Sequence, residues 1–401
     1  MRILFLTDNF FPEVNAPANR TYEHCIEWVR KGVDVTVVTT APNFPNGKVF
    51  KNYSNKLIFK ENIDGIKVVR VWSYISANEG TIKRILDYVS FAHSAFWASL
   101  FIKADVIVAT SPQFFTAISG RMISLFKRKP WIMEVRDIWP ESIVAVGAIT
   151  NKYIIRFLEW IELGLYQSAN KIIVVTDSFK EIISQKGIEY DKIEIVKNGV
   201  NLQLFEARKK DEQIINELGL EGKCVIAYIG THGMAHSLDF IMHCIPKINN
   251  TSVHFLFIGD GAEKSKLIEL KNKLGLKNVS MLDTVPKHEI VNYLSVVDIS
   301  LVCLKKSDTF KSVIPSKIFE NAAMNKAILL GVEGESADII NSYHAGICFE
   351  PENEISFVNS LNEIIRLNAT KEFEHGCKNL ATDFDRKNLA LKMLDIIKEA
   401  V

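Results

Sequence analysis

The sequence predicts an α/β protein built from two doubly wound, Rossmann-like domains. Short continuous apolar runs, which are typical of parallel strands buried on both faces, alternate with segments of helical period. Such alternation predicts parallel sheets with helices on both faces. The pattern stops and restarts once along the chain, and 401 residues are too many for one ordinary core, so two domains are expected.

The first half opens with a βαβ unit. The apolar run at 2–7 predicts a strand, helical spacing of apolar side chains predicts a helix over 19–30, and 33–39 predicts the next strand. Gly32 is a typical stop signal for that helix. Further strands are expected at 104–110, 131–135, 171–176 and 193–196.

The second half repeats the alternation after a charged segment near 203–213. We therefore expect one domain over 1–204 and another over 205–385. Because ligands bind outside the carboxyl ends of parallel strands, the loops that follow strands are the places to look for a site. The strands of this half are expected at 224–229, 253–259, 279–282, 299–304 and 327–330.

Composition excludes several classes of protein. Net charge is only +1, the balance of +5 over residues 1–204 is small, and no basic stripe with interleaved aromatics occurs, so a nucleic-acid partner is not expected. The six cysteines show no CxxC spacing, which indicates reduced thiols of a cytoplasmic protein rather than a zinc site or a disulfide framework. The N-terminus lacks signal-peptide features, and no apolar run is long enough to span a membrane.

A glycine-rich turn follows the strand expected at 224–229. Its sequence is Gly230-Thr231-His232-Gly233-Met234-Ala235-His236. Backbone N–H groups in such a turn can bind phosphate at the start of a helix. The spacing is not GxGxxG, so a dinucleotide site is not indicated. A tight turn that simply requires glycine is the alternative.

The segment Pro315-Ser316-Lys317-Ile318-Phe319-Glu320 has the residues of a helix start. Glu320 would lie one turn in, where a carboxylate can accept both hydroxyl hydrogen bonds of a ribose diol. Lys317 could neutralise a phosphate. Ordinary pairing of a carboxylate with the helix dipole is the alternative for Glu320. Lys305 and Lys311 follow the strand at 299–304, where a solvated charged loop is the simpler interpretation.

Two features of the first half also suggest binding. Arg136 and Asp137 follow the strand at 131–135, where the Arg fork suits phosphate or carboxylate; a structural ion pair is the alternative. Apolar residues at helical spacing over 81–103, flanked by Lys and Arg, suit an interfacial helix. A core-facing helix explains this stripe equally well, and we prefer it. Asp383-Phe384-Asp385 looks like a DxD metal signature but follows no apolar strand, so no metal site is expected.

In their order and spacing, these motifs resemble the family-4 retaining glycosyltransferases, which have the GT-B fold. The resemblance covers essentially the whole chain. Two further segments, 42–47 and 136–140, resemble a bacterial branch that acts in O-antigen and capsule assembly and includes N-acetyl-L-fucosamine transferases that use a UDP-sugar. The motifs that carry the resemblance are Phe11-Pro12-Glu13, Lys197-Asn198-Gly199-Val200, the turn at Gly230, Gly259-Asp260-Gly261 and Pro315-Ser316-Lys317-x-x-Glu320.

The chain departs from the family pattern at three places. Ser312 stands where the family's Glu-x7-Glu has its first Glu, while Glu320 matches the second. Thr231 and His236 stand where the family has the Arg and Lys that hold the donor pyrophosphate, and Arg136 replaces the His of its usual His-Asp pair. We therefore assign the pyrophosphate to Lys317, Lys305 or Lys311, with backbone N–H groups of 231–233.

The resemblance implies two domains that face a central cleft, with the acceptor on the first and the donor on the second. It implies a helix over 386–401 that packs back on the first domain, and front-face transfer without a metal or cofactor, the UDP-sugar being a substrate. The uracil would lie near Val285. The expected donor-binding residues are Gly230, Thr231, His232, His236, Val285, Lys305, Lys311, Ser312, Val313, Ile314, Pro315, Ser316 and Glu320; the acceptor-binding residues are Asn15, Arg20 and Glu141; the catalytic residues are Arg136, Asp137 and Lys317.

The expected function is transfer of a sugar, N-acetyl-L-fucosamine by resemblance, to a lipid-pyrophosphate-linked saccharide. The enzyme would be cytoplasmic, with peripheral contact to the inner membrane face. Two alternatives remain on the same fold. One is a UDP-sugar epimerase, and the other is a nucleotide-sugar-binding subunit without turnover.

Overall fold

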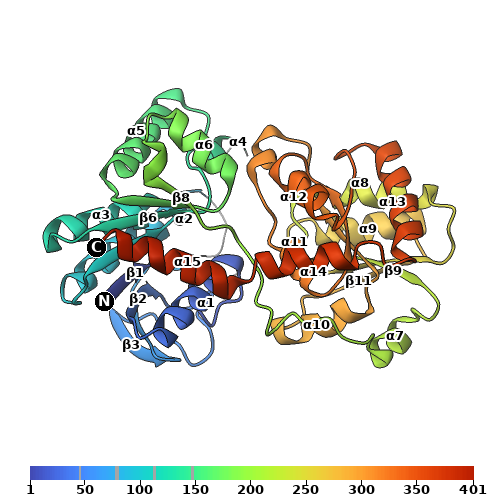
Figure 1. The fold of residues 1–401 in the computed structure, drawn as a ribbon, viewed down its shortest axis with the longest axis horizontal. Coiled ribbons are helices and arrows are strands. Elements are labelled where there is room, and N and C mark those ends of the chain that lie inside the picture. The colour runs from blue at the N-terminus through green and yellow to red at the C-terminus, as the bar shows by residue number, and fades with distance from the viewer. Residues whose placement is uncertain (45–46, 77–80, 112–113, 146–148) are drawn as a thin grey trace. The chain divides into compact units, whose positions relative to one another are not determined.

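The computed structural model describes residues 1–44, 47–76, 81–111, 114–145 and 149–401 (Figure 1). Pro45 and Asn46 of the segment 42–47 lie outside this description. The chain forms two compact units: unit 1 comprises Met1–Asn198 with Arg386–Val401, and unit 2 comprises Gly199–Asp385. Each unit holds one sheet with helices on both faces, which confirms the predicted fold class.

The sheet of unit 1 has the strand order β3-β4-β2-β1-β5-β6-β7-β8. All described pairings are parallel except that of β3 with β4. That antiparallel hairpin was not expected from the sequence, because β3 is half-exposed and β4 carries charged residues at two positions. The strands are β1 Arg2–Leu6, β2 Asp34–Thr40, β3 Ile58–Ile63, β4 Ile66–Val71, β5 Val106–Thr110, β6 Trp131–Val135, β7 Lys171–Val174 and β8 Ile193–Ile195.

Helices cover both faces of this sheet. On one face α1 and α15 pack together, and Trp28 of α1 donates from Nε1 to the carbonyl of Ala390 at 2.7 Å (Figure 1). On the other face α2, α3, α5 and α6 cover the core. The helices are α1 Ala16–Arg30, α2 Thr81–Leu100, α3 Phe114–Lys127, α4 Glu141–Ala145, α5 Lys152–Ser168, α6 Asp177–Gln185 and α15 Arg386–Glu399, with a short 3-10 turn η1 Tyr190–Lys192.

The sheet of unit 2 is parallel throughout, in the order β11-β10-β9-β12-β13-β14. Alternate side chains of β9 and β10 belong to two cores on opposite faces, as expected for strands buried on both sides. The strands are β9 Cys224–Ile229, β10 Val253–Ile258, β11 Val279–Leu282, β12 Ile299–Cys303, β13 Ala327–Gly331 and β14 Gly346–Cys348.

In unit 2 helices precede, connect and follow these strands. They are α7 Glu212–Leu218, α8 Leu238–Cys244, α9 Lys264–Leu274, α10 Lys287–Val296, α11 Lys317–Ala323, α12 Glu335–Tyr343, α13 Glu354–Asn368 and α14 Glu374–Asp383, with 3-10 turns η2 Met234–His236, η3 Ile245–Lys247 and η4 Asp308–Ser312. Among the parallel strands the order reverses between β1 and β5 in unit 1 and between β9 and β12 in unit 2. Such switch points open a crevice at the carboxyl ends of the strands.

A buried ion pair ties α1 to the sheet of unit 1. Arg20 Nε donates to Glu134 at 2.9 Å, and the side chains are 3% and 1% exposed. The other guanidinium nitrogens donate to the carbonyls of Val196 and Lys197 at 2.9 Å. Burial opposes ionisation of Glu134, but the positive charges of Arg20 and Arg136 lower its pKa below the ordinary value. Through these hydrogen bonds Arg20 holds α1 against the segment that follows β8.

We predict that Glu134→Gln lowers the free energy of unfolding of unit 1 by about 3–5 kcal/mol, because it leaves a buried guanidinium without its counter-charge. All six tryptophans lie in the sequence of unit 1, so tryptophan fluorescence during urea unfolding reports on that unit. Asp34→Asn, which removes the exposed pair with Lys67, is the control and should cost less than about 1 kcal/mol. An equally small loss of unfolding free energy in both variants would contradict a stabilising role for the buried Arg20–Glu134 pair.

Candidate functional site

Three glycines bring the loops after β9 and β10 into contact in unit 2. A Cβ on Gly259 would lie 1.9 Å from the carbonyl oxygen of Gly230, and one on Gly261 would lie 2.5 Å from that of His232. Any side chain at these positions would push the two loops apart. The glycine turn expected from the sequence is therefore a close backbone crossing, and it fixes where His232 lies.

A lysine ammonium is buried beside this crossing. Lys317 Nζ lies 3.6 Å from the centroid of the Tyr228 ring, and a Cβ on Gly230 would lie 2.6 Å from it. Among the described residues this nitrogen has neither a hydrogen-bond partner nor an ion pair. Burial lowers the pKa of Lys317 to about 8, so the ammonium is charged near neutral pH. Within the described part of the chain no carboxylate forms an ion pair with it.

Two histidines complete the cluster around Tyr228. The rings of His232 and His236 lie 6.0 Å and 5.7 Å from the Tyr228 ring. Burial and nearby cationic lysines lower the pKa of each imidazole to about 4, so both are neutral near pH 7. His232 is fully buried, and neither ring nitrogen has a partner among the described residues. A neutral imidazole can donate one hydrogen bond, so the cluster suits an anion with several acceptor oxygens.

Glu320 lies one turn into α11, on the same helix as Lys317, and its negative charge acts on the Lys317 ammonium. It is half-buried. Pro315 and Ser316 precede α11, as expected, but the Ser316 side chain makes no capping hydrogen bond. Glu320 therefore lies where its carboxylate could accept hydrogen bonds from the hydroxyls of a ligand bound next to the Lys317 ammonium.

Several of the other residues expected at the donor site pair or hydrogen-bond with neighbouring residues of the protein. Lys311 is exposed and pairs with Asp308 at 2.7 Å and Glu333 at 3.8 Å. Ser312 Oγ donates to the Thr309 carbonyl at 3.1 Å. Of the remainder, Lys305 and Thr231 are exposed, Val285 is half-buried, Ile314 is buried, and the carbonyl of Val313 accepts from Ser336. Of the three candidate lysines, Lys317 has the most suitable position for a pyrophosphate.

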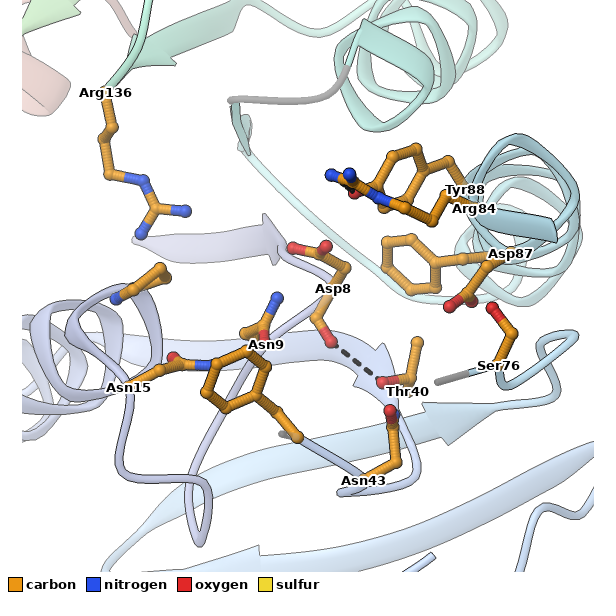
Figure 2. Close-up of a pocket in the computed structure, with 13 residues that line it drawn as sticks. Asp8, Asn9, Asn15, Thr40, Asn43, Ser76, Arg84, Asp87, Tyr88 and Arg136 are labelled. Atoms are coloured by element: carbon orange, nitrogen blue, oxygen red, sulfur yellow. Dashed lines mark hydrogen bonds between the residues drawn. The ribbon is translucent and has the colours of Figure 1, made fainter. Parts of the chain in front are cut away.

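A pocket of about 260 Å³ opens at the carboxyl ends of the strands of unit 1 (Figure 2). Asp8 and Asn9 follow β1, Thr40 ends β2, and Arg136 follows β6. Its size lies just below the range of about 300–1,000 Å³ that is usual for small-molecule sites. The lining residues are Asp8, Asn9, Asn15, Pro17, Thr40, Asn43, Phe44, Ser76, Arg84, Asp87, Tyr88, Phe91 and Arg136.

The lining combines hydroxyl-binding groups, aromatic rings and cations. Burial raises the pKa of Asp87 to about 7, and the nearby Asp8 carboxylate adds to the shift. Arg136 Nε donates to the Ser111 carbonyl at 3.0 Å, which leaves Nη1 and Nη2 without partners among the described residues. Figure 2 shows Asp8 between Arg136 and the side chains of α2. Carboxylates and amides bind sugar hydroxyls, and a free guanidinium edge binds an anion.

Of the other residues predicted in unit 1, one lines the pocket and the rest bond elsewhere in the unit or lie outside its lining. Asn15 lines the pocket and caps α1. Arg20 does not fit an acceptor contact, because it is 2% exposed and bonded within the protein. Glu141 pairs with Lys186 and does not line the pocket. Asp137 forms no ion pair with Arg136 in the described part of the chain; burial raises its pKa to about 6.

Sequence reasoning missed most of the pocket lining. Asp8, Asn43 and Asp87 were not singled out as site residues, although Asp8 directly follows a predicted strand and Asn43 lies in the loop after another. The position of Asp8 after β1 was a usable signal. Asp87 lies on a helix, within the apolar stripe, and gave no such signal. Among the described residues no cluster of three or more His, Cys, Asp or Glu could hold a metal ion, and Asp383 accepts a hydrogen bond from Tyr343.

Two family descriptions match consecutive parts of the chain. Residues 18–204 match Glycosyltransferase Family 4, and residues 210–382 match Glycosyl transferases group 1. Together the two matches span nearly the whole chain. The chain belongs to the family-4 glycosyltransferases. This glycosyltransferase is 22% identical over 380 residues to WcaI of Escherichia coli (strain K12), named as a colanic acid biosynthesis glycosyl transferase, with 92% of this chain and 93% of WcaI covered.

Solved structures show the same GT-B fold. The sucrose-phosphate synthase of Thermosynechococcus elongatus aligns with a TM-score of 0.79 at 12% identity, over 99% of this chain and 98% of that one. HepE of Anabaena, solved with UDP and with UDP-glucose, aligns with a TM-score of 0.73 at 14% identity, over 100% of both chains. The fold prediction is thereby confirmed for this glycosyltransferase.

We predict that binding of UDP weakens as pH rises through about 8. An anion binds the protonated Lys317 more tightly. Between about pH 7, where the phosphates of UDP are already ionised, and the Lys317 pKa of the free protein, the affinity should be nearly constant, and above that pKa it should fall by up to about tenfold per pH unit. Calorimetric titration over this range measures the effect. In Lys317→Met, binding should be weak and should lack this pH step. An identical pH profile in both proteins would remove Lys317 from the site.

Proposed function

We propose that this glycosyltransferase transfers a sugar, with retention of configuration, from a UDP-sugar to a lipid-pyrophosphate-linked saccharide during bacterial polysaccharide assembly. The observation that carries the proposal is the buried Lys317 ammonium without a counter-ion, set beside two neutral histidines. A diphosphate supplies the missing negative charge. Because an unpaired buried charge is costly, the site is stabilised when the donor is bound.

The donor is assigned to unit 2. The pyrophosphate of a UDP-sugar would contact Lys317, His232 and His236, and Glu320 would accept hydrogen bonds from the ribose hydroxyls. The family's Arg and Lys are thus replaced by one lysine from α11 and two imidazole donors. The likeness to HepE, which was solved with UDP and UDP-glucose, supports a uridine nucleotide.

The acceptor is assigned to the pocket of unit 1. Its aromatic side chains can stack against a sugar ring, while Asp8, Asn43 and Asp87 can bind the hydroxyls. Arg136 lines this pocket, and its buried Nη1 and Nη2 atoms have no hydrogen-bond partner among the described residues, so its guanidinium suits the pyrophosphate of a lipid-linked acceptor. The name of WcaI, which refers to colanic acid biosynthesis, supports polysaccharide assembly. N-acetyl-L-fucosamine as the transferred sugar rests on the sequence resemblance.

Catalysis is proposed to depend on positioning and charge stabilisation. In front-face transfer the acceptor hydroxyl attacks the anomeric carbon on the side from which the phosphate leaves. The hydroxyl proton passes to a phosphate oxygen, so neither a protein nucleophile nor a metal takes part. Lys317 and the two histidines would stabilise the negative charge that develops on the leaving UDP. Asp137 would help to position the acceptor in unit 1.

We predict that Glu320→Ala weakens UDP binding by about 1.5–3 kcal/mol, the usual value of hydrogen bonds to a charged group. Glu221→Ala, which changes an exposed carboxylate of the same unit, should leave affinity unchanged. The 2′-deoxy form of UDP should bind the parent protein more weakly than UDP, and Glu320→Ala should reduce that difference. Unchanged UDP affinity in Glu320→Ala would exclude the ribose contact.

We predict that Arg136→Met lowers transfer by about 100-fold while UDP affinity stays constant, because a charge-assisted contact to the acceptor is lost in unit 1. The assay is release of UDP from a UDP-sugar by a lipid-pyrophosphate saccharide, in the presence of a chelator. Formation of a sugar isomer without acceptor would favour an epimerase. UDP binding without any turnover would favour a binding subunit.

A further inference from the structure

Unit 1 exposes a group of large apolar side chains, mostly aromatic, that do not line its proposed acceptor pocket. It consists of Trp97, Phe101, Leu125, Phe126, Phe157 and Trp160, which we call the aromatic face. Phe101 is 87% exposed, Leu125 and Phe126 are 68% exposed, and Trp160 is 69% exposed. The side chains come from α3, α5, the C-terminal end of α2 and the residue that follows it, Phe101.

Contacts connect these helices into one layer. Phe96 of α2 packs its ring 5.4 Å from both Trp97 and Phe126, which joins α2 to α3. Arg121 of α3 donates to the carbonyl of Gly164 at 3.3 Å, which joins α3 to α5. Along α5, Phe157 and Trp160 stack with their centroids 6.1 Å apart. The aromatic face is therefore a feature of neighbouring helices and not a set of scattered side chains.

These side chains are not needed for the core of unit 1. In α5, only Glu162, Leu165 and Tyr166 are buried, although the helix is rich in apolar residues. The sequence had suggested that the stripe over 81–103 faces the core. That preference is wrong for much of the stripe, since Ile85, Val89 and Trp97 are exposed. Exposed apolar surface of this extent usually marks an interaction site.

The charges around the aromatic face are almost all positive. The exposed cations are Lys103, Arg128, Lys129, Lys152 and Arg156, and none of them forms an ion pair within the described ranges. In α2, α3 and α5 the carboxylates are Asp87, which lines the pocket, Glu162, which is buried, and Glu159, which is exposed. Two copies of such a surface would repel each other, so a symmetric dimer is disfavoured.

We propose that the aromatic face is a docking surface for an anionic phospholipid bilayer. Tryptophan and phenylalanine insert at the headgroup level, while surrounding Lys and Arg attract acidic lipids. No helix within the described residues is apolar and long enough to cross a bilayer, so the contact is peripheral. The inference rests on the proposed function in one respect: α2 also supplies Arg84, Asp87 and Tyr88 to the pocket, so docking would hold that pocket near a lipid-linked acceptor.

Flotation of the full chain with vesicles tests this proposal. We expect binding to vesicles of phosphatidylglycerol and phosphatidylcholine in equal parts, and little binding to phosphatidylcholine alone. Phe157→Ser with Trp160→Ser should reduce binding at least about tenfold, as should Lys152→Glu with Arg156→Glu. The matched controls are Leu57→Ser with Ile355→Ser, which also removes exposed apolar side chains, and Lys209→Glu with Lys273→Glu. Both controls should bind like the parent chain.

Two outcomes would overturn the proposal. One is that the parent chain does not bind the vesicles, or that the test and control substitutions reduce vesicle binding equally. The other is a dimer in light scattering that Phe157→Ser with Trp160→Ser dissociates, which would make the face an interface between copies. Each variant should unfold in urea at the midpoint of the parent, followed by tryptophan fluorescence, which reports on unit 1 and shows that the variant is folded. Vesicle binding without UDP binding would contradict the proposed function alone, and UDP binding without vesicle binding would contradict only this inference.

Discussion

A buried ammonium without a counter-ion is the constraint on which the proposed donor site depends. Lys317 is charged near neutral pH, and in the described part of unit 2 no carboxylate pairs with it. The Tyr228 ring gives it only a cation–π contact at 3.6 Å. A side chain at Gly230 would displace the ammonium from this position, and Gly259 and Gly261 let the loop with His232 close beside it. The backbone crossing and the cation thus form a single site that an anion would complete.

The candidate site of unit 1 is also formed by loops that follow parallel strands, but its residues differ in chemistry from those of unit 2. Its pocket also lies at the carboxyl ends of parallel strands, where β1, β2 and β6 deliver side chains to one place. Arg20 and Glu134 form an ion pair within the core, while Arg136 and Arg84 are the cations among the residues that line the pocket. One unit therefore offers a compact anion site and the other a site for hydroxyls and one anion. That difference matches a nucleotide-sugar donor and a saccharide acceptor.

The fold could be predicted from the sequence because buried parallel strands appear as continuous apolar runs. The hairpin β3–β4 was missed because charged and half-exposed residues interrupt its pattern. Lys317 and Glu320 could be nominated from a helix-start motif, but only the structure shows that Lys317 is buried whereas Lys311 is ion-paired at the surface. Arg20 was misjudged because its partner Glu134 is 114 residues away. No local pattern predicts that such a distant pair is buried.

The most direct test of the central claim is a crystal structure of the chain with UDP. The β-phosphate should lie within hydrogen-bond distance of Lys317 Nζ and of a ring nitrogen of His232, and the ribose hydroxyls should face Glu320. UDP bound elsewhere, with the Lys317 ammonium still free beside Tyr228, would contradict the claim that this buried cation is the donor pyrophosphate site.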